Sequence, residues 1–533
     1  FTSLKNKQIF RLFESTDGQI WIGTYTQGIT VYQPKTGKFQ NILAGDSPDQ
    51  LSHPLIMAFA QPSSNQIWVG SFGGGINVLD IDSKKIFKKI NTNSNAKSSL
   101  NDNNIGDLLV DNNNLIWVGT WGHGLNRFNA NNKAFDILRY SLSGDVHKGL
   151  LHHPDIFSVL PTENQLWIGS RGKGISVLDK DLSKKIIIPA LDVLSNMQIK
   201  SLYQTKNKNI WIGTIANGLF LYIPKDQTLQ QLSLLKDFPK TIIETIISDN
   251  SGNLWIGTDS GLIKYAPANK KISHYVHNKN DRNSLSGNVI ESLAFDHKGI
   301  LWIGTHAGLN ALNPISNRIT RIVNLPNQKN SLSNNHINSM LFDSQNRLWI
   351  ATAQDINVMK NWDGTSSPLF QSLNQFAQVI PSWRENLLED NSGNIWALRD
   401  SKFLIRINTD INLNSKVNDH IKSDTKFWQV TEFSKIEGIN FGSSWTGSQS
   451  KNNQGHLFFG GTEGLLRVRP ELAQSSNSKP SIAFIKLTID GQQRPIKQIT
   501  DGLVLSSKDK RFTLEFTALN ALHPADIIFE YRL

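Results

Sequence analysis

A short phrase built around one tryptophan recurs along the whole chain, and its spacing limits the folds that the chain can adopt. The clearest copy reads LWIGTDSGLIKY, from Leu254 to Tyr265. At intervals of 44 to 50 residues its Trp recurs, as Trp21, Trp68, Trp117, Trp167, Trp211, Trp255, Trp302, Trp349 and Trp396. A tenth, altered copy, LFFGGTEGLLRV, has Phe459 in the Trp position. Repetition at this period indicates an array of identical supersecondary units, as in a propeller.

Each copy has the same internal order. Around Trp255, the apolar alternation IIETIISD is followed by the turn NSGN, the strand LWIGT, a short Gly loop and the segments GLIKYAP and KISHYV. Four short strands separated by turn signals make one propeller blade. Helical periodicity is nearly absent, so the chain is predicted to be all-β.

The repeated residues have predicted structural roles. Trp255 offers a large flat face to the neighbouring blade, and Gly257 allows the backbones to approach where blades converge. Gly261 follows the tight loop, where we expect a positive φ. Asp249, in the turn DNSGN, is expected to accept hydrogen bonds from nearby backbone amides.

Ten copies exceed the four to eight blades of an ordinary propeller, so the chain divides as seven plus three or three plus seven. The last copy runs directly into a different kind of segment, which favours a complete C-terminal ring counted back from Phe459 to Trp167. We therefore predict three blades of a truncated propeller over residues 1–146. A seven-bladed β-propeller follows over 147–478, and the first part of an Ig-like β-sandwich over 479–533. The first boundary is expected between Ser141 and Pro154, and both ends of the chain are expected to be cut.

Composition excludes several classes of protein. The 533 residues include 38% hydrophobic and 19% charged residues and no cysteine, which excludes disulfides, thiolate metal sites and a cysteine nucleophile. No apolar run approaches the roughly 18 residues of a membrane helix. The net charge is +11, but the basic residues are scattered and the longest cluster, KDKR (Lys508 to Arg511), is short. We therefore expect no nucleic-acid partner, and membrane attachment only through a segment outside this sequence.

The repeat D-x-x-G-x-L/I-W-I-G-T-x-x-G-L/I resembles the two-component regulator propeller family. FIKLTIDGQ and FEYRL, near the end, resemble the opening of the three-tyrosine (Y_Y_Y) sandwich domain that follows the propellers in those sensors. The resemblance implies the periplasmic input region of an inner-membrane protein, with a histidine kinase or diguanylate cyclase transmitter and oligosaccharide ligands. It also implies association of two chains through the sandwich domain. One copy, IWALRDSKFLIRI, departs from the repeat because it lacks the Gly-Thr pair.

Motifs for catalysis, cofactors and metals do not fit. The glycine run SFGGGI lacks the Lys-Ser/Thr pair of a phosphate-binding loop, and DNSGN lacks the spaced oxygens and distant Glu of a calcium loop. His274 and His277, or His152 and His153, have no further ligand at a supporting spacing. Glu244, Glu291, Glu385 and Glu389 cannot be paired as glycosidase carboxylates from sequence, and no copy fits the sialidase-type Asp box. We predict no catalytic residue, no metal and no cofactor.

Ligand binding is the remaining prediction. The loop after each Trp strand and the loop entering each innermost strand should share one face, and polar groups converging beside aromatic ones indicate a binding site. Five Trp lie outside the repeated phrase and could stack on sugars, although packing is the commoner role: Trp121, Trp362, Trp383, Trp428 and Trp445. The candidate ligand-binding residues are Arg171, Lys173, Asn217, Asp259, His306, Gln354, Trp383, Arg399 and Glu463.

The sequence thus predicts a ligand-sensing region that binds an oligosaccharide or similar small ligand and forms a homodimer through the sandwich domain. Two alternatives remain open: a propeller lyase or glycosidase, and a protein-binding scaffold.

Overall fold

The computed structural model describes residues 4, 8–47, 49–92, 100–111, 114–129, 134–140, 150–232, 241–328, 330–359, 362, 368–373, 384–401, 403–409, 428–434, 437–473, 481–495 and 510–519. Over these residues the protein is all-β, and most of its antiparallel sheets have four strands, consistent with propeller blades. The chain divides into two compact units, Phe1–Ala473 and Gln474–Leu533, close to the predicted start of the last domain. No helix in the described part of the chain is long and apolar enough to cross a membrane.

The first three copies of the repeat form three consecutive sheets. The first contains β1 (Ile9–Glu14), β2 (Ile20–Thr24), β3 (Ile29–Gln33) and β4 (Lys38–Ile42). The second contains β5 (Ile56–Ser63), β6 (Gln66–Ser71), β7 (Gly75–Asp80) and β8 (Ile86–Ile90). The third has three strands, β9 (Ile105–Val110), β10 (Leu115–Thr120) and β11 (Leu125–Asn129).

The next seven copies form seven four-stranded sheets. The first sheet consists of β13 (Ile156–Pro161), β14 (Gln165–Ser170), β15 (Ile175–Asp179) and β16 (Lys185–Ile186). The second consists of β17 (Ile199–Gln204), β18 (Ile210–Thr214), β19 (Leu219–Ile223) and β20 (Thr228–Gln231). The third consists of β21 (Ile243–Ser248), β22 (Leu254–Thr258), β23 (Gly261–Ala266) and β24 (Lys271–Tyr275). The next three consist of β25 (Ile290–Phe295), β26 (Leu301–Thr305), β27 (Gly308–Asn313) and β28 (Arg318–Ile322); β29 (Ile337–Phe342), β30 (Leu348–Thr352), β31 (Ile356–Met359) and β32 (Gln371–Ser372); and β33 (Arg384–Glu389), β34 (Ile395–Arg399), β35 (Phe403–Asn408) and β36 (Gln429–Phe433). The last has β37 (Ser444–Lys451), β38 (Leu457–Gly461) and β39 (Gly464–Val468), together with a strand from earlier in the chain. Two short 3-10 helices, η2 (Pro189–Leu194) and η4 (Pro470–Leu472), follow β16 and β39.

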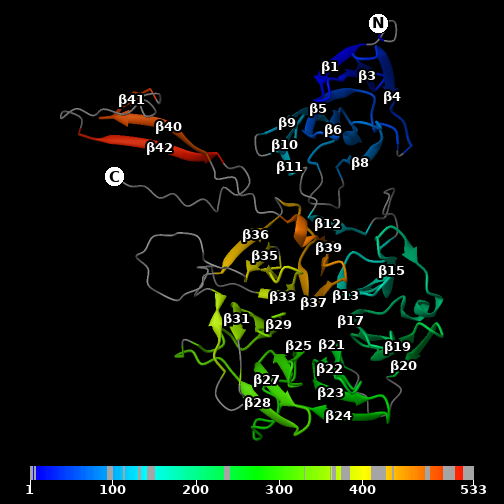
Figure 1. Cartoon of the computed structure of the whole chain (residues 1–533), viewed down its shortest axis with the longest axis vertical. Helices are drawn as coiled ribbons and strands as arrows, with labels where there is room; N and C mark the ends of the chain where they lie inside the picture. Colours follow the sequence, from blue (N-terminus) through cyan, green and yellow to red (C-terminus); the bar gives the residue numbers. More distant parts are fainter. Residues whose placement is uncertain are drawn as a thin grey trace. The chain divides into compact units, whose positions relative to one another are not determined.

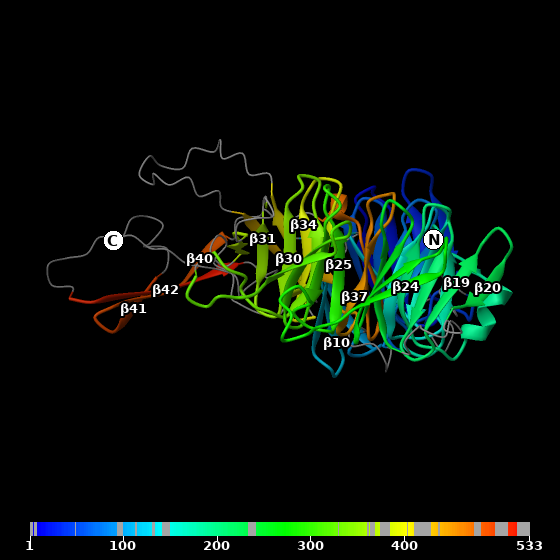
Figure 2. The same ribbon diagram turned by 90° about the horizontal axis from the view of Figure 1, so that it is seen from below.

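The seven sheets are arranged around a common axis. Their first strands contact one another in the order β13, β17, β21, β25, β29, β33 and β37, and β37 contacts β13 again. Figure 1 shows these inner strands grouped around the centre, and Figure 2 shows the same sheets from the side. We call β13, β17, β21, β25, β29, β33 and β37 the inner strands, and the seven sheets the ring.

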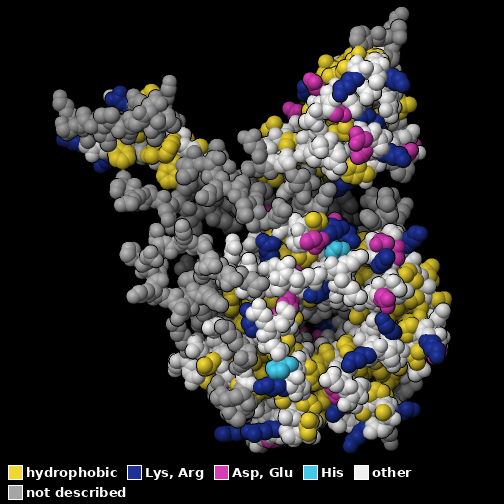
Figure 3. Space-filling model, in the orientation of Figure 1, with side chains coloured by type: hydrophobic (Ala, Val, Ile, Leu, Met, Phe, Trp, Pro, Cys, Tyr) yellow, Lys and Arg dark blue, Asp and Glu magenta, His cyan; other side chains and the backbone are white. Residues whose placement is uncertain are grey.

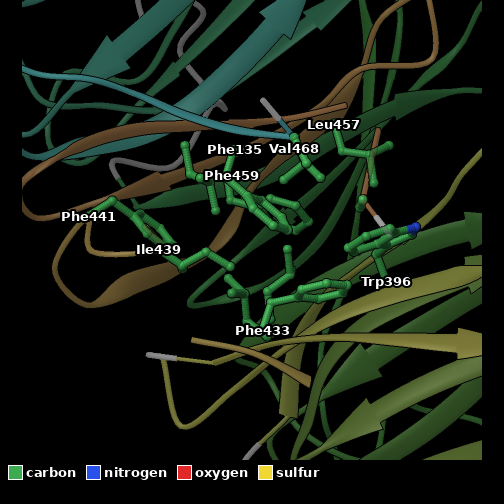
Figure 4. Close-up of a cluster of buried hydrophobic side chains, with 13 residues drawn as sticks. Phe135, Trp396, Phe433, Ile439, Phe441, Leu457, Phe459 and Val468 are labelled. Atoms are coloured by element: carbon green, nitrogen blue, oxygen red, sulfur yellow. The ribbon is translucent and has the colours of Figure 1, made fainter. Parts of the chain in front are cut away.

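The strand that completes the last sheet is β12 (Phe135–Leu138), which pairs antiparallel with β39. The predicted range 1–146 had assigned these residues to the N-terminal blades, and for this strand the pairing corrects that prediction. Phe135 packs in a buried cluster with Trp396, Phe433 and Phe459 (Figure 4). Because β12 covers what would otherwise be an exposed edge of the last sheet, it fastens the end of the ring to its beginning.

The repeated phrase folds as predicted in most of its details. The marker Trp residues of the ring are at most 4% exposed, and each packs against the following sheet; Trp211, for example, lies in a cluster with Ile243 and Tyr265. A Cβ on Gly257 would lie 2.7 Å from Ile290 of the next sheet, and Gly261 has a φ of 124°. Both glycine predictions are therefore confirmed.

The acidic residue of the turn has a second role beyond the predicted one. Asp249 accepts hydrogen bonds from the backbone amides of Ser251 and Asn253, as expected, and also from Nε1 of Trp255 at 3.1 Å. The same indole-to-carboxylate bond holds Trp302, Trp349 and Trp396. A buried indole N–H needs an acceptor, which explains why the Asp precedes the Trp by six residues.

The threonine of the phrase closes the loop that follows it. Thr258 Oγ1 donates a hydrogen bond to the carbonyl of Gly261, at 2.7 Å, and Thr305 bonds Gly308 in the same way. In the copy that lacks Gly-Thr, positions 398 and 399 are Leu and Arg, and the hairpin instead has positive φ values at Asp400 and Ser401.

The second unit contains a three-stranded antiparallel sheet among its described residues. β40 (Ser481–Ile489) pairs with β41 (Gln492–Arg494) and β42 (Phe512–Leu519). Asp490 and Gly491 form the turn between β40 and β41, with φ of 47° and 81°, the signs that a two-residue hairpin with an Asp-Gly turn requires.

Candidate functional site

Two kinds of loop lie together on one face of the ring. The loop after the Trp strand donates a backbone hydrogen bond to the residue just before the inner strand: Arg171 to Asp155, His306 to Val289 and Ala353 to His336, at 3.0 to 3.2 Å. The predicted common face, here called the loop face, is therefore present in the ring.

The predicted ligand-binding residues are distributed around this face. Arg171, Lys173, Asn217, His306 and Gln354 are exposed, and Asp259, Arg399 and Glu463 are partly buried. Trp383 lies outside the described residues. Near the axis, Arg171 and His306 each contact residues of the inner strands. Arg399 is turned away from the axis, since it pairs with Glu432 of the outer strand β36 at 2.6 Å.

Every inner strand has an irregularity near the loop face. In β13, β17, β21, β25 and β29 the register shifts by one residue, so that one residue of each strand is skipped in the backbone pairing with the Trp strand. These residues are Phe157, Lys200, Glu244, Glu291 and Asn338. Because a bulge bends the strand and re-aims a side chain, equivalent positions around the axis present Phe, Lys, Glu or Asn on one repeated backbone.

Lys200 and Glu244 form an ion pair between neighbouring inner strands. Nζ of Lys200 lies 3.1 Å from Oε2 of Glu244, and both side chains are 11% exposed. Nζ also donates to the carbonyl of Thr446 on β37, at 3.1 Å, and lies over the ring of Phe157. One ammonium group thus ties β17 to β21 and β37, and passes across β13.

An aromatic cluster lies where the ring closes. Trp445 of β37 packs edge-on against Phe157 of β13, with ring centroids 4.9 Å apart, and its Nε1 donates to Oδ1 of Asp155 at 2.5 Å. Arg171 lies 5.6 Å above the ring of Trp445 and 3.5 Å from the second oxygen of Asp155. Of the other Trp outside the phrase, Trp362 and Trp428 pack on Trp302 and Trp349, which confirms the packing role for these two.

A carboxylate and two imidazoles form a third group at the axis. His306 Nε2 lies 2.9 Å from Oε1 of Glu291, and the ring of His336 stacks on that of His306 at 3.9 Å. Beside Glu244, Asp259 accepts hydrogen bonds from the hydroxyls of Thr241 and Ser260. The loop residues predicted from sequence thus meet inner-strand residues that were not predicted.

Burial and neighbouring charges shift the pKa values of these groups in different directions. Burial raises the pKa of Glu244, against the opposing charge of Lys200, and the carboxylates of Glu291 and Asp259 raise it further. Burial would also raise the pKa of Glu291, but the hydrogen bond with His306 and the charge of Lys200 hold it below its usual value. Burial and the adjacent His306 lower the pKa of His336. Such perturbed groups beside one another are typical of functional sites, although structural ion-pair networks also produce them.

The bulge of β37 is longer than the others and reaches across the axis. Its residues between Ser444 and Gln449 lie outside the register of backbone pairing with β38. Its backbone accepts from Lys200 and donates, through Gly447, to Oδ1 of Asn386, and Gln449 bonds Ser339 of β29. Figure 3 shows the ring hollowed near its centre. We call Asp155, Phe157, Arg171, Lys200, Glu244, Glu291, His306, His336 and Trp445 the mouth residues.

Sequence reasoning missed most of the residues that the inner strands contribute to the mouth. Phe157, Lys200 and His336 were not predicted, and Glu291 was considered only as a carboxylate that could not be paired. A signal was nevertheless present in the sequence. The triplets IFS, IKS, IES and INS precede the strands of Trp167, Trp211, Trp302 and Trp349, and each has a variable residue between a constant Ile and a constant Ser. The serines are structural, since Ser158 and Ser201 donate to the backbone of the next inner strand. Glu389, by contrast, bonds Ser344 and lies apart from the mouth.

The described residues hold no group of three or more His, Asp or Glu side chains that could bind a metal ion. His274 and His277 contact the backbone carbonyls of Ser260 and Leu285.

Comparison with known families identifies the repeat. The sequence pattern described as "two component regulator propeller" matches residues 3–26, 99–122, 193–216, 284–307 and 331–354. Five segments of the chain therefore match the repeat of the two-component regulator propeller family. The matched segments include Trp21, Trp117, Trp211, Trp302 and Trp349, so they fall in both groups of sheets.

One solved structure has a similar fold. The extracellular domain of the hybrid two-component system BT3049 from B. thetaiotaomicron matches with a TM-score of 0.69 and 22% identity, over 97% of this chain and 64% of that one. This chain therefore spans less than two thirds of that structure. The extracellular domain of the one-component system BT4673 from the same organism (17% identity, 92% and 85% covered) and PorZ of the type-IX secretion system of Porphyromonas gingivalis (12%, 96% and 82%) have TM-scores of 0.25 and 0.46, too low to carry an argument. No curated protein sequence matches the chain.

Proposed function

We propose that the chain is the extracytoplasmic ligand-sensing region of a membrane-anchored two-component signalling protein, and that its ligand is an oligosaccharide or similar small molecule. The ring is its complete seven-bladed propeller, and the three N-terminal sheets belong to a second propeller. The unit from Gln474 onward begins an Ig-like sandwich. The region lies in the periplasm and lacks catalytic activity of its own, and the transmitter is a histidine kinase or a diguanylate cyclase.

The observation that carries this proposal is the group of mouth residues on the loop face. Constant scaffold residues hold variable side chains at equivalent positions around one axis, and variation on a constant scaffold suits recognition. Trp445 and Phe157 supply an apolar surface, while Lys200, Glu244 and Glu291 supply donors and acceptors beside it, which is the composition of a small-ligand site.

Two further observations support the wider architecture. The closed order of inner-strand contacts, completed by β12, suits an independent ring. Phe10 and Leu12 on β1, and Leu109, Trp121 and Leu125 on the third sheet, are large apolar side chains between 47% and 66% exposed. Such surfaces at both ends of the three-sheet group support the proposal that further blades cover them.

Signal transfer requires that the ligand distinguish two arrangements of the protein. A ligand shifts an equilibrium only by its differential affinity for the two states. We propose that binding on the loop face changes how two sandwich domains associate in a homodimer, and that this change is passed across the membrane.

Calorimetric titration of the whole chain with oligosaccharide fractions tests the proposal. Saturable binding without any change in the sugar supports a sensor, whereas product formation supports a lyase or glycosidase. Silence across a broad glycan panel, together with capture of a defined periplasmic protein on the loop face, would favour a protein-binding scaffold.

A further inference from the structure

The charges at the mouth indicate which class of ligand the ring can accept, an inference that rests on the proposed function. The protein as a whole carries a net charge of +11, which would favour an acidic glycan. The balance of charge at the mouth differs from that of the whole protein, because the Lys and Arg side chains there already have anionic partners within the ring.

Both the Arg and the Lys among the mouth residues are paired. Arg171 lies 3.5 Å from Asp155 and Lys200 lies 3.1 Å from Glu244, while the imidazole of His306 lies 2.9 Å from Glu291. At the rim, Arg139 pairs with Glu463 and Arg399 with Glu432. Within the described part of the loop face, Lys173 is the one Lys or Arg among the predicted ligand-binding residues for which no ion pair is seen, and it is exposed to solvent.

The acidic groups at the mouth would oppose an anion. Glu291 and Asp259 lie close enough to Glu244 to raise its pKa, and the charge of Lys200 acts on both Glu244 and Glu291. A sulfate or carboxylate that paired with Lys200 in place of Glu244 would leave that carboxylate partly buried without its partner. Leaving one member of a buried pair without its partner destabilises the complex by more than an ion pair between the ligand and an exposed lysine at the rim would stabilise it.

The same ion pairs can form hydrogen bonds with the hydroxyl groups of a ligand. A paired ammonium retains a donor direction, and a paired carboxylate retains free lone pairs, so a sugar hydroxyl can donate to one and accept from the other. Trp445 lies beside them, partly buried, at the closure of the ring, where its indole can pack against the apolar face of a sugar ring.

We propose that the mouth of the ring binds an uncharged sugar unit, packed on Trp445 and hydrogen-bonded to the Lys200–Glu244 pair, and that it rejects acidic glycans. Residues Lys200, Glu244 and Trp445 are then the specificity-determining residues of the sensor.

The experiment compares two ligand mixtures on the whole chain. Short neutral hexose and pentose oligosaccharides and hexuronic acid oligosaccharides of matched length are titrated calorimetrically at low and high salt. We expect the neutral mixture to bind with an affinity that changes less than about twofold with salt, since no ion is exchanged. The acidic mixture should not bind at the same concentrations. Tighter binding of the acidic mixture, weakened by salt, overturns this inference while leaving the sensor proposal intact, whereas failure of both mixtures contradicts the sensor proposal itself.

A double substitution tests the location without leaving a stranded charge. Lys200→Met with Glu244→Gln should weaken neutral binding by about tenfold or more, the loss expected for hydrogen bonds to charged groups. The control is Lys208→Met with Glu163→Gln, because that pair has the same 3.1 Å separation but is 64% and 70% exposed, and it should change affinity less than about twofold. Trp445→Ala provides a second test, with circular dichroism to show that the sheets are retained. Unchanged affinity in both mouth variants places the ligand elsewhere and overturns the inference.

Discussion

Lys200 and Glu244 contact each other across two inner strands, with 3.1 Å between Nζ and Oε2 and only 11% of each side chain exposed. Eight residues further along the chain, Lys208 makes an ion pair of the same length with Glu163 in solvent. Comparing these two pairs separates the effect of burial on the free energy of unfolding from the effect of the ion pair itself.

Removing one partner from each pair should have very different effects on stability. Lys200→Met leaves Glu244 charged and without its ammonium, which should lower the free energy of unfolding by about 3–5 kcal/mol. Lys208→Met should cost only about 0–1 kcal/mol, since its partner stays hydrated. Urea denaturation of both variants measures the difference, and equal losses would show that the Lys200 pair is not buried as described.

The acidic residue of each turn is expected to stabilise its blade through the tryptophan. Asp390 is 4% exposed and accepts from Trp396 Nε1 at 2.7 Å and from the amides of Ser392 and Asn394. Asp390→Ala should therefore lower the free energy of unfolding by about 2–4 kcal/mol, since it strands a buried indole N–H and frees the turn. Asp226→Ala, at an exposed turn position, should lie within about 0.5 kcal/mol of the parent. A small effect at Asp390 would contradict the assigned role of the indole bond.

The glycine after the Trp strand should not tolerate a methyl group. At Gly257 a Cβ would lie 2.7 Å from both Ile290 Cγ2 and Thr245 Cγ2. Gly257→Ala should lower stability by about 1–3 kcal/mol through overpacking between two sheets. Gly172→Ala is the control, since the nearest atom to its Cβ is His153 Nε2 at 4.0 Å. The thermal midpoints of the two variants provide the measurement, and a neutral Gly257→Ala would mean that the blades are further apart.

The stacked histidines predict a pH dependence with a definite sign. Burial and His306 lower the pKa of His336 from its usual 6.5, against the opposing effect of Glu291. The folded protein then binds fewer protons there than the unfolded chain, so stability rises with pH up to about 6.5 and is lost as pH falls below that value. Glu291 and His306 face His336, and the raised pKa of Glu244 changes stability with pH in the opposite direction, so the variant must be compared with the parent.

His336→Asn should reduce the loss of stability between neutral and mildly acidic pH. His297→Asn, at an exposed turn residue, should leave the pH profile unchanged. Denaturation midpoints at several pH values check both variants. A profile for His336→Asn that parallels the parent would show that this imidazole contributes no proton linkage.

The repeat allowed much of the fold to be predicted, but not how the ring closes. Trp255, Gly257 and Gly261 have local roles that a single copy of the phrase already specifies. The pairing of Phe135–Leu138 with β39 depends on contacts between residues more than 300 positions apart, and nothing in this four-residue segment identifies the strand with which it pairs. Strand register is set by the surrounding sheet as well as by local pattern.

The candidate site was predicted in part for a related reason. Arg171, Asp259 and His306 follow the repeated phrase directly, so their loop could be located. Lys200 and Glu291 project from bulges within strands, and a bulge is a feature of the pairing between two strands. The variable residue between Ile and Ser marks these positions only once the register is known.

The central claim is that a ligand binds at the mouth of the ring, and amide hydrogen exchange with and without a saturating neutral oligosaccharide tests it most directly. The account predicts slower exchange in residues 155–158, 199–201, 243–245, 290–292 and 444–448, with little change at the turns around Asp249 and Asp390. Protection confined to those turns or to β40–β42, with the mouth unaffected, would contradict it.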